Sequence, residues 1–581
     1  MILIVPCCGK GRGGGHLTRC ISLVKDLRAM GRETFLYLND QNENIVKLLE
    51  TMEFNATWML TDTSALPKID FIVLDRFQTP RDEFIYWKKI APVIALDEGG
   101  SSRKDFDFLI DMLIPDGFIK PAANIYSPGL LVKEITQRTQ RNTDGTKEKK
   151  VLVTFGQEDS AGLGLKTVND LVLKNNIEKL NIILLRGALT SNSEIPENVN
   201  VIENIPNLAE HLHEYDVVIT HYGITAYEAV FAGCEVFLAH PTPYHKKLAK
   251  AAGFTTFTQI HGGIKSEQST NSMKLHGLKF ENQTLAGLIN SYSPIVSRSC
   301  PVCNSENTYA VARFTDRTYR RCSKGGLIFM ERLNPPPVEY ENDYFFESYK
   351  KQYGKTYLDD FDNIKKAGKQ RLKIIDKILC RKGDDCEQPT LLDIGCAFGP
   401  FLDAAREENY SVFGLDPAKE AVDYVRQKLG IEAVQGLFPF TYSALSDSQH
   451  YSVITLWYVI EHFTECKIIL NEIKRILKPG GIMAFSAPSY SGISGSSDLK
   501  KFLYTSPADH FTVWSPRIVK RVLFRAGFKV KKIIITGHHP ERFPILGRFA
   551  KSKKSPVYWL LLAISKLFKL GDTFEVFAQL N

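Results

Sequence analysis

A glycine-containing loop follows a predicted buried strand in the C-terminal half of this 581-residue chain. Residues 391–399 read LLDIGCAFG, which places Asp393, Gly395 and Gly399 close together. A strand that runs into glycines and then into a helix lets the backbone approach a nucleotide-like ligand. Asp416 ends the next predicted strand, about 20 residues after Gly395, where an acid can accept hydrogen bonds from ribose hydroxyls. The spacing predicts a nucleotide-type cofactor site.

Two histidines downstream of this loop are candidate bases. His462 follows Glu461, after a predicted strand at 451–457, and His510 follows Asp509. Histidine titrates near neutral pH and can remove a proton from a reacting group. We therefore predict His462 and His510 as catalytic residues, with helix capping or packing as the competing interpretation of His462.

A second glycine loop follows the first predicted strand of the chain. Residues 13–20 read GGGHLTRC and bring Gly13, Gly15, His16 and Arg19 to the carboxyl end of that strand. Ligands of α/β proteins bind at such strand ends. We predict that Gly13, Gly15 and Arg19 bind substrate and that His16 is catalytic.

Two acids end other strands of the same predicted sheet. Asp75 follows the strand 71–74, and Asp97 follows the strand 93–96. Because carboxyl ends of parallel strands meet at one edge, both acids are expected to face the same cleft as the glycine loop. The competing interpretation is a binding module without turnover, in which the glycines only form a tight turn.

A third candidate site lies near the middle of the first half. Residues 221–228 read HYGITAYE, with Gly223, Thr225 and Glu228 at the start of a predicted helix. Amide groups at a helix N-terminus can bind diphosphate, and Glu228 lies one or two turns further along, within reach of a ribose. His245 lies in a polar loop beyond the next strand. We predict a substrate site of Gly223, Thr225, Glu228 and His245.

Three cysteines show the spacing of a zinc ribbon. Cys300 and Cys303 form a C-x-x-C pair, Cys322 follows, and Gly325 stands where the fourth ligand is usual. Cys300, Cys303 and Cys322 are the predicted metal ligands, completed by another cysteine or by water. The alternative is a relic ribbon that holds no metal.

These residues require strands and helices to position them. The alternation of apolar strands and amphipathic segments predicts an α/β chain with two Rossmann-like lobes, a small ribbon and a third Rossmann-like domain. The predicted regions are a first lobe at 1–137, a second lobe at 150–290, the ribbon at 299–330 and a domain at 340–581. A polar linker at 137–150 separates the two lobes. The aromatic residues of 340–357 form either a lid over the cofactor or ordinary packing.

The composition excludes several classes of protein. Hydrophobic residues make up 44% and charged residues 24%, which rules out a disordered chain. The net charge of +8 gives no case for a nucleic-acid partner. The apolar run 557–564 is too short to span a bilayer, although the basic residues before it could contact a membrane peripherally. Eleven cysteines and no predicted leader at the N-terminus indicate a cytoplasmic protein with reduced thiols.

Residues 340–581 resemble the class I S-adenosylmethionine-dependent methyltransferases. The resemblance rests on the loop at 391–399, Asp416, and the sequences LKPGG at 477–481 and DHF at 509–511. It implies S-adenosyl-L-methionine as the cofactor, with Asp393, Gly395 and Gly399 around its methionine and adenosine portions, Asp416 at the ribose and Gln435 near the adenine. The sequence departs from the family at Ser452 and Leu437, where acids are common.

The cysteine segment resembles the small zinc ribbon that precedes some sugar-modifying methyltransferases. One thiolate of that pattern is missing at Gly325.

Residues 1–290 resemble the two-lobed GT-B nucleotide-sugar enzymes, especially the UDP-sugar hydrolase of pseudaminic acid synthesis and related glycosyltransferases. The shared patterns are G-x-G-H-x-x-R, beginning at Gly13, and G-x-T-x-x-E, beginning at Gly223. The resemblance implies that His16 is the base at the anomeric carbon and that Glu228 binds the nucleotide ribose. Gln157 and the pair 244–245 depart from the hydrolases.

Together these features predict a bifunctional enzyme of bacterial surface-glycan biosynthesis. A nucleotide-sugar hydrolase or glycosyltransferase would use a UDP- or CMP-linked sugar, and the methyltransferase would act on a sugar or glycoconjugate. One alternative is a glycan-binding scaffold whose only activity is methyl transfer. Another is a small-molecule methyltransferase with a quinone-like acceptor.

Overall fold

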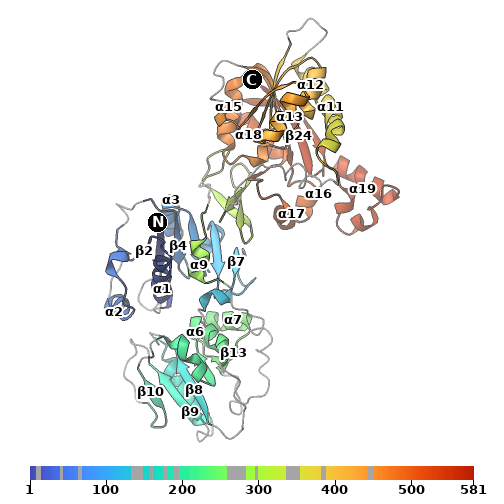
Figure 1. Ribbon diagram of the computed structural model, residues 1–581. Coiled ribbons are helices and arrows are strands. Elements are labelled where there is room, and N and C mark those ends of the chain that lie inside the picture. The colour runs from blue at the N-terminus through green and yellow to red at the C-terminus, as the bar shows by residue number, and fades with distance from the viewer. Residues whose placement is uncertain are drawn as a thin grey trace. The chain divides into compact units, whose positions relative to one another are not determined.

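The computed structural model divides the chain into two compact units (Figure 1). Unit 1 contains Met1–Val296, Arg313–Thr318 and Arg332–Pro335, and unit 2 contains Ser297–Ala312, Tyr319–Glu331 and Pro336–Asn581. The structure describes residues 1–7, 15–39, 43–62, 68–132, 148–156, 159, 161–174, 180–186, 195–203, 205, 207–257, 283–294, 299–334, 354–380, 388–441 and 450–581. Gly13, Gln157, most of the linker 137–150 and the predicted lid residues before 354 lie outside these ranges.

The first sheet of unit 1 is parallel and has the order β3-β2-β1-β4-β5-β6-β7. Its strands are β1 (Ile2–Pro6), β2 (Thr34–Tyr37), β3 (Met59–Leu60), β4 (Phe71–Asp75), β5 (Val93–Leu96), β6 (Phe108–Asp111) and β7 (Ile125–Tyr126). Helices α1 (Gly15–Ala29) and α2 (Glu43–Thr51) contribute to the core on one face, and α3 (Arg81–Ile90) to the core on the other. Because β1, β4 and β5 are buried throughout, these strands consist of apolar residues with hardly any alternation.

The second sheet of unit 1 is also parallel and has the order β10-β9-β8-β11-β12-β13. Its strands are β8 (Lys149–Thr154), β9 (Leu180–Leu185), β10 (Asn200–Ile202), β11 (Val217–Thr220), β12 (Glu235–Leu238) and β13 (Thr255–Thr256). The helices are α4 (Leu163–Lys174), α5 (Leu208–His211), α6 (Ile224–Phe231) and α7 (Pro243–Ala252). Helix α9 (Leu285–Asn290) returns to the first sheet and packs against α1 through Leu285 and Ile289.

The main sheet of unit 2 has the order β19-β18-β17-β20-β21-β24-β23. Strands β17 to β21 are parallel, and β24 is inserted antiparallel between β21 and β23. The strands are β17 (Thr390–Ile394), β18 (Ser411–Asp416), β19 (Glu432–Gln435), β20 (Tyr451–Trp457), β21 (Leu477–Pro488), β23 (Phe528–Thr536) and β24 (Thr573–Leu580). This order, with one reversed strand next to the edge, confirms the α/β prediction for this region.

Helices cover both faces of this sheet (Figure 1). Helices α11 (Phe361–Leu379), α12 (Pro400–Glu407) and α13 (Lys419–Lys428) lie on one side, and α15 (Cys466–Ile476) and α18 (Pro516–Ala526) lie on the other. The buried residues of α15 recur at helical spacing, as Cys466, Ile469, Leu470 and Ile473, which turns one face of the helix to the core. Pro516 starts α18, and Gly527 ends it at φ 93°.

A small sheet joins the cysteine segment to the larger domain of unit 2. Its order is β14-β15-β16-β22, with β14 (Thr308–Arg313), β15 (Arg317–Cys322) and β16 (Ile328–Arg332) from the segment after Cys300. Strand β22 (Thr512–Val513) pairs antiparallel with β16 through Ile328 and Phe329. The cysteine segment therefore shares a sheet with the chain that follows His510.

The C-terminal region adds three further helices, α16 (Ile493–Ser497), α17 (Leu499–Thr505) and α19 (Pro556–Leu567). Within the described ranges, no helix has both the length and the apolar character needed to cross a membrane.

Candidate functional site

The glycine loop after β17 has a backbone that requires glycine. Gly395 and Gly399 have φ values of 72° and 78°, in the left-handed region that disfavours other residues. A Cβ atom at Gly395 would lie 2.5 Å from Cγ2 of Val459, so the loop after β20 packs directly on this glycine. The two loops therefore meet at the carboxyl edge of the sheet.

Asp416 connects the glycine loop to the end of β18. Its Oδ2 accepts a hydrogen bond from the Ala397 backbone N–H at 2.8 Å, and its Oδ1 accepts one from Ala418 at 2.9 Å. Burial raises the pKa of this carboxyl to about 6. Each carboxylate oxygen has a second lone pair, so Asp416 retains two acceptor positions.

Asp393 lies deeper in the sheet than Asp416. Its Oδ1 accepts a hydrogen bond from the Thr455 hydroxyl on β20 at 2.6 Å, and the residue is buried. Burial raises the pKa of this carboxyl to about 7, and the nearby Arg371 guanidinium limits the rise. Asp393 is thus placed to hold β17 and β20 together beneath the glycine loop.

Gln435 is exposed at the end of β19, directly opposite Asp416 in the strand register. Its Nε2 donates a hydrogen bond to the Pro417 carbonyl at 3.1 Å. Leu437, one of the two departures from the family pattern, is exposed nearby. Ser452, the other departure, stands at the start of β20 and contacts Thr390, so it lies at the far end of the strands from the glycine loop.

A cluster of acids and imidazoles lies beyond the end of β20. Glu461 and His462 belong to a short 3-10 helix, Ile460–His462, and Asp509 and His510 approach it from the loop before β22. Asp509 Oδ2 lies 3.1 Å from His462 Nδ1. The rings of His462 and His510 are nearly perpendicular, with centroids 4.8 Å apart.

Hydrogen bonds from side chains and from the backbone fix the loop that carries His510. The Thr512 hydroxyl lies 3.3 Å from the Ile460 carbonyl and accepts a hydrogen bond from Trp514 Nε1 at 2.9 Å. The Met330 N–H on β16 donates to the Phe511 carbonyl at 2.8 Å. Strand β16 therefore holds Phe511, the residue next to His510, through this hydrogen bond.

Both histidines were predicted from the sequence, but their meeting in one cluster with Glu461 and Asp509 was not. Glu461 is buried, and neither of its carboxylate oxygens has a hydrogen-bond partner within the described part of the chain. Burial raises the pKa of Glu461 to about 7 and lowers that of His510 to about 3. The signal in the sequence was an acid directly before each histidine, but it did not show that the two pairs meet.

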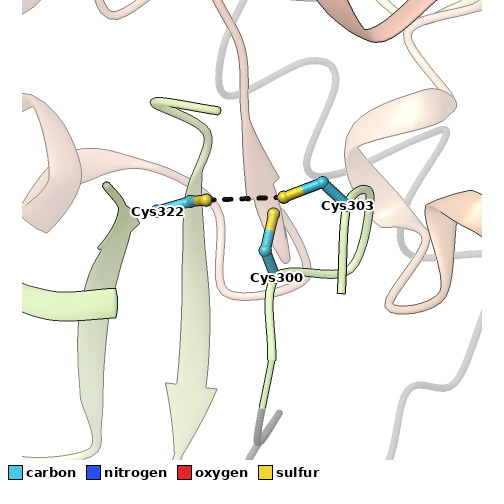
Figure 2. A group of neighbouring side chains, drawn as sticks. All are labelled: Cys300, Cys303 and Cys322. Carbon is cyan, nitrogen blue, oxygen red and sulfur yellow. Dashed lines mark hydrogen bonds between the residues drawn. The ribbon is translucent and has the colours of Figure 1, made fainter. Parts of the chain in front are cut away.

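The three cysteines gather at one end of the ribbon (Figure 2). Cys303 Sγ and Cys322 Sγ are 3.6 Å apart, and all three sulfur atoms lie within 4.8 Å of one another. A Cβ atom at Gly325 would lie 3.6 Å from Cys322 Sγ and 3.9 Å from Cys303 Sγ. Gly325 therefore occupies the position from which a fourth thiolate would complete the group.

The cysteines also belong to the hydrophobic core of unit 2. Cys300 and Cys322 pack with Leu327 and Phe329, and burial raises the pKa of Cys300 to about 12. A closed zinc site needs four ligands, and among the described residues only these three cysteines converge here. The residues present do not fit a closed structural zinc site.

In unit 1, a buried group of charged residues joins α1 to the ends of β4 and β5. Arg19 donates from Nε and Nη2 to Asp75, at 2.7 and 2.6 Å, and from Nη1 to Asp97 Oδ2 at 2.7 Å. His16 Nδ1 lies 2.7 Å from Asp75 Oδ1. Asp75 and Asp97 thus lie at one edge of the sheet, and Arg19, which we predicted to bind substrate, is buried with its guanidinium between them.

The charges of this group stabilise one another. Burial would raise the pKa of Asp75, but Arg19 and His16 together hold it below its usual range. Asp75 is therefore an ionised partner for His16. The His16 side chain remains partly exposed. Gly15 starts α1 and is exposed, whereas Gly13 lies outside the described residues.

The second predicted substrate loop lies at the start of α6. Gly223 is the residue before the helix, and Thr225 and Glu228 lie on its first two turns. Burial alone raises the pKa of Glu228 to about 7. His245 Nδ1 lies 2.7 Å from the Thr242 hydroxyl at the start of α7.

His221, the first residue of the segment 221–228, also belongs to this group, although its spacing alone did not predict a role. Its ring stacks on Phe155 with centroids 6.2 Å apart, and burial lowers its pKa to about 4, with His245 contributing to the shift. A contact between the sheets of unit 1 lies close by, because the Tyr222 hydroxyl donates to the Leu113 carbonyl at 2.6 Å.

Several large apolar side chains are exposed near the C-terminus of the chain. They are Ile545, Leu546, Phe549, Trp559, Leu560, Leu567 and Phe568. Lys551, Lys553 and Lys554, which are also exposed, lie between them in the sequence. We call these ten residues the C-terminal patch.

Comparisons with known proteins agree with the fold of unit 2. Residues 361–533 match the model of a family described as a methyltransferase domain. Together with the strand order, this match shows that the C-terminal part of the chain is a class I methyltransferase domain, which uses S-adenosylmethionine. The predicted methyltransferase activity is confirmed at this level.

Three relatives illustrate the extent of the similarity. An uncharacterized protein of Methanocaldococcus jannaschii is 22% identical over 364 residues, covering 56% of this chain and 70% of that protein. A ubiquinone biosynthesis O-methyltransferase of Salmonella arizonae is 26% identical over 133 residues, so the alignment spans 19% of this chain and 55% of the relative. The crystal structure of a methyltransferase from Archaeoglobus fulgidus aligns with 42% of this chain and all of its own, at 19% identity and a TM-score of 0.29.

Proposed function

We propose that the methyltransferase domain binds S-adenosylmethionine at the glycine loop and transfers its methyl group to an acceptor beside Glu461, His462 and His510. The main observation behind this proposal is that Gly395 packs on Val459, two residues before Glu461. The glycine loop therefore adjoins the cluster of Glu461, His462 and His510. When bound, the cofactor supplies an electrophilic methyl group on sulfur. Asp416 would accept hydrogen bonds from the ribose hydroxyls, and Gln435 would lie near the adenine.

The acceptor that we favour is a sugar or a glycoconjugate. This choice is supported by the fusion of the methyltransferase domain with unit 1, which has two parallel sheets, each with a polar group at strand ends. The archaeal relative covers 56% of this chain, which is more than the region 340–581 contains.

A quinone-like small molecule is the second candidate acceptor. It is favoured by the similarity to a ubiquinone biosynthesis O-methyltransferase. The two candidates differ in what unit 1 contributes, because a quinone acceptor leaves unit 1 without a role in the same pathway.

For unit 1 we propose hydrolysis or transfer of a UDP- or CMP-linked sugar. His16, held by Asp75, would act as the base through Nε2, and Glu228 would bind the nucleotide ribose. The α6 N-terminus at Gly223 and the side chain of His245 would contact the diphosphate or phosphate. If unit 1 only binds glycans, the chain is a scaffold with one activity.

We propose that the C-terminal patch contacts an anionic membrane surface. Its apolar side chains can enter the interface, and its three lysines are attracted to acidic lipids. The test is sedimentation with vesicles of phosphatidylcholine alone or with phosphatidylglycerol added. Binding only to the anionic vesicles, and its loss in Trp559→Ser with Lys553→Glu, is expected; equal sedimentation with both vesicle types would refute the proposal.

One experiment addresses both enzymatic proposals. The full chain is incubated with a panel of UDP- and CMP-sugars, with and without a quinol acceptor, in the presence of methyl-labelled S-adenosylmethionine. Mass spectrometry then identifies labelled products and released nucleotide. Label on a sugar supports the first acceptor class, and label on the quinol alone supports the second. Unchanged sugar nucleotides would remove the enzymatic proposal for unit 1.

A further inference from the structure

We propose that Glu461, His462 and His510 bind one divalent transition-metal cation beside the methyl-donor loop. One ligand atom from each residue lies within 4.8 Å of the ligand atoms of the other two. Such spacing allows three donors to converge on a single cation without a rearrangement of the backbone. The residues come from two segments that Thr512 holds together, so the arrangement is built by the fold.

The environment of Glu461 is the second observation. Its side chain is almost fully buried, with the residue 1% exposed, and neither carboxylate oxygen has a hydrogen-bond partner among the described residues. A buried carboxylate without partners is costly, and most buried polar groups in proteins are satisfied. A cation between Glu461 and the two imidazoles would supply the missing interaction.

Asp509 has the position of an outer partner of the site. Its Oδ2 lies 3.1 Å from Nδ1 of His462. A histidine that binds a metal usually donates its other ring N–H to a carboxylate, which fixes the tautomer and the ring orientation. Nδ1 of His462 makes no aligned hydrogen bond among the described residues, so a cation at Nε2 would leave Nδ1 to donate to Asp509. Asp509 is therefore a positioning residue.

The donor set indicates the kind of metal. Two imidazoles and one carboxylate suit zinc, cobalt, iron or manganese better than magnesium or calcium, which prefer oxygen ligands. Three protein ligands leave coordination positions open. A hydroxyl of the acceptor could occupy one and lose its proton more easily there. His462 and His510 would then be ligands, in place of the catalytic bases that we predicted from the sequence.

The acceptor step rests on the proposed methyltransferase function, but metal binding does not. The experiment therefore measures Co²⁺ binding to the full chain by calorimetry and by absorption spectroscopy, and S-adenosylmethionine binding separately. Cobalt held by nitrogen and oxygen lacks the sulfur-to-metal charge-transfer band that cobalt at the cysteines of the ribbon would give. The wild-type spectrum thus distinguishes the two sites.

We expect one Co²⁺ per chain without a sulfur band. Glu461→Gln and His510→Ala should abolish this binding, and Asp509→Asn should weaken it about 10- to 100-fold. His539→Ala, which removes a partly exposed histidine paired with Glu541, is the control and should bind normally. S-adenosylmethionine binding that survives in Glu461→Gln shows that the domain is folded.

Three results would overturn the inference: no cobalt binding, a sulfur band alone, or binding that neither Glu461→Gln nor His510→Ala affects. Failure of S-adenosylmethionine to bind the wild-type chain would instead reject the proposed function and leave the metal result standing.

Discussion

Asp75 holds His16 and Arg19 with one carboxylate. Its Oδ1 lies 2.7 Å from His16 Nδ1 and 2.6 Å from Arg19 Nη2, while Oδ2 binds Arg19 Nε. An ionised Asp75 favours the histidine tautomer that carries its proton on Nδ1. His16 Nε2 is then an acceptor, as the proposed base role requires.

The first prediction concerns His16. His16→Ala should lower sugar-nucleotide turnover about a hundredfold or more, the usual contribution of a positioned proton transfer. Methylation of a supplied acceptor should be unchanged, because the methyltransferase site lies in unit 2. Both rates are measured by mass spectrometry on the same preparation. If turnover is unaffected, unit 1 is a binding module.

The second prediction concerns the stability of unit 1. Arg19→Ala leaves Asp75 and Asp97 buried without their cation and should cost about 3 to 5 kcal/mol of unfolding free energy. Arg32→Ala is a matched control, because Arg32 pairs with Asp70 at the surface and should cost about 0 to 1 kcal/mol. Urea denaturation followed by circular dichroism measures the unfolding free energy of both variants. Equal losses would show that the buried pairs of Arg19 stabilise the chain no more than the surface pair of Arg32 does.

The third prediction tests cofactor binding. Asp416→Ala should weaken S-adenosylmethionine binding by about 1 to 3 kcal/mol, because the ribose hydroxyls lose their partner. Asp423→Ala, which removes an exposed acid on the neighbouring α13, should leave the affinity unchanged. Isothermal titration calorimetry distinguishes the two. An Asp416→Ala chain that is folded and binds the cofactor normally would contradict the assignment.

The fourth prediction follows from the pKa of Asp416, which burial raises to about 6. The cofactor ribose needs the ionised carboxylate as an acceptor, so affinity should fall about tenfold per pH unit below about pH 6 and level off above about pH 7. A raised pKa also means that ionisation of Asp416 reduces the stability of the cofactor-free chain as the pH rises from about 4 through about 6. Calorimetry across this range checks the affinity, and Asp416→Asn should remove its dependence on this group.

The fifth prediction concerns the ribbon. Gly325→Cys should create a four-thiolate zinc site, because a Cβ atom there lies at contact distance from the sulfur atoms of Cys303 and Cys322. Wild-type chain should carry at most one zinc, and the variant should retain one after dialysis against a chelator. The metal content is measured by mass spectrometry. Retention of zinc by Gly325→Cys with Cys322→Ser would place the ion elsewhere.

The central strands could be predicted from the sequence because buried parallel strands leave short apolar runs. The predicted strands at 93–96 and 451–457 coincide with β5 and β20. Strand β22 was not predicted, because two residues carry no periodic signal and its partner β16 lies far away in the sequence.

The site residues also differ in how far the sequence alone could predict them. The glycine loop and Asp416 are local features with a fixed spacing, so the sequence located them. The meeting of Glu461 with His510, and the burial of Arg19 between two acids, depend on contacts between distant segments. Such contacts arise from the packing of the sheet, and they cannot be predicted from any single stretch of the sequence.

The pairing of β16 with β22 makes the folding of the cysteine segment depend on the larger domain. Strand pairing and an apolar core that includes Cys300, Leu327 and Phe329 connect the cysteine segment to the larger domain. The ribbon and the loop at 509–511 therefore belong to one cooperative unit, whose amides should exchange with solvent at a common rate. Loss of the pairing between β16 and β22 should therefore release the loop that carries His510 even if the rest of the domain stays folded.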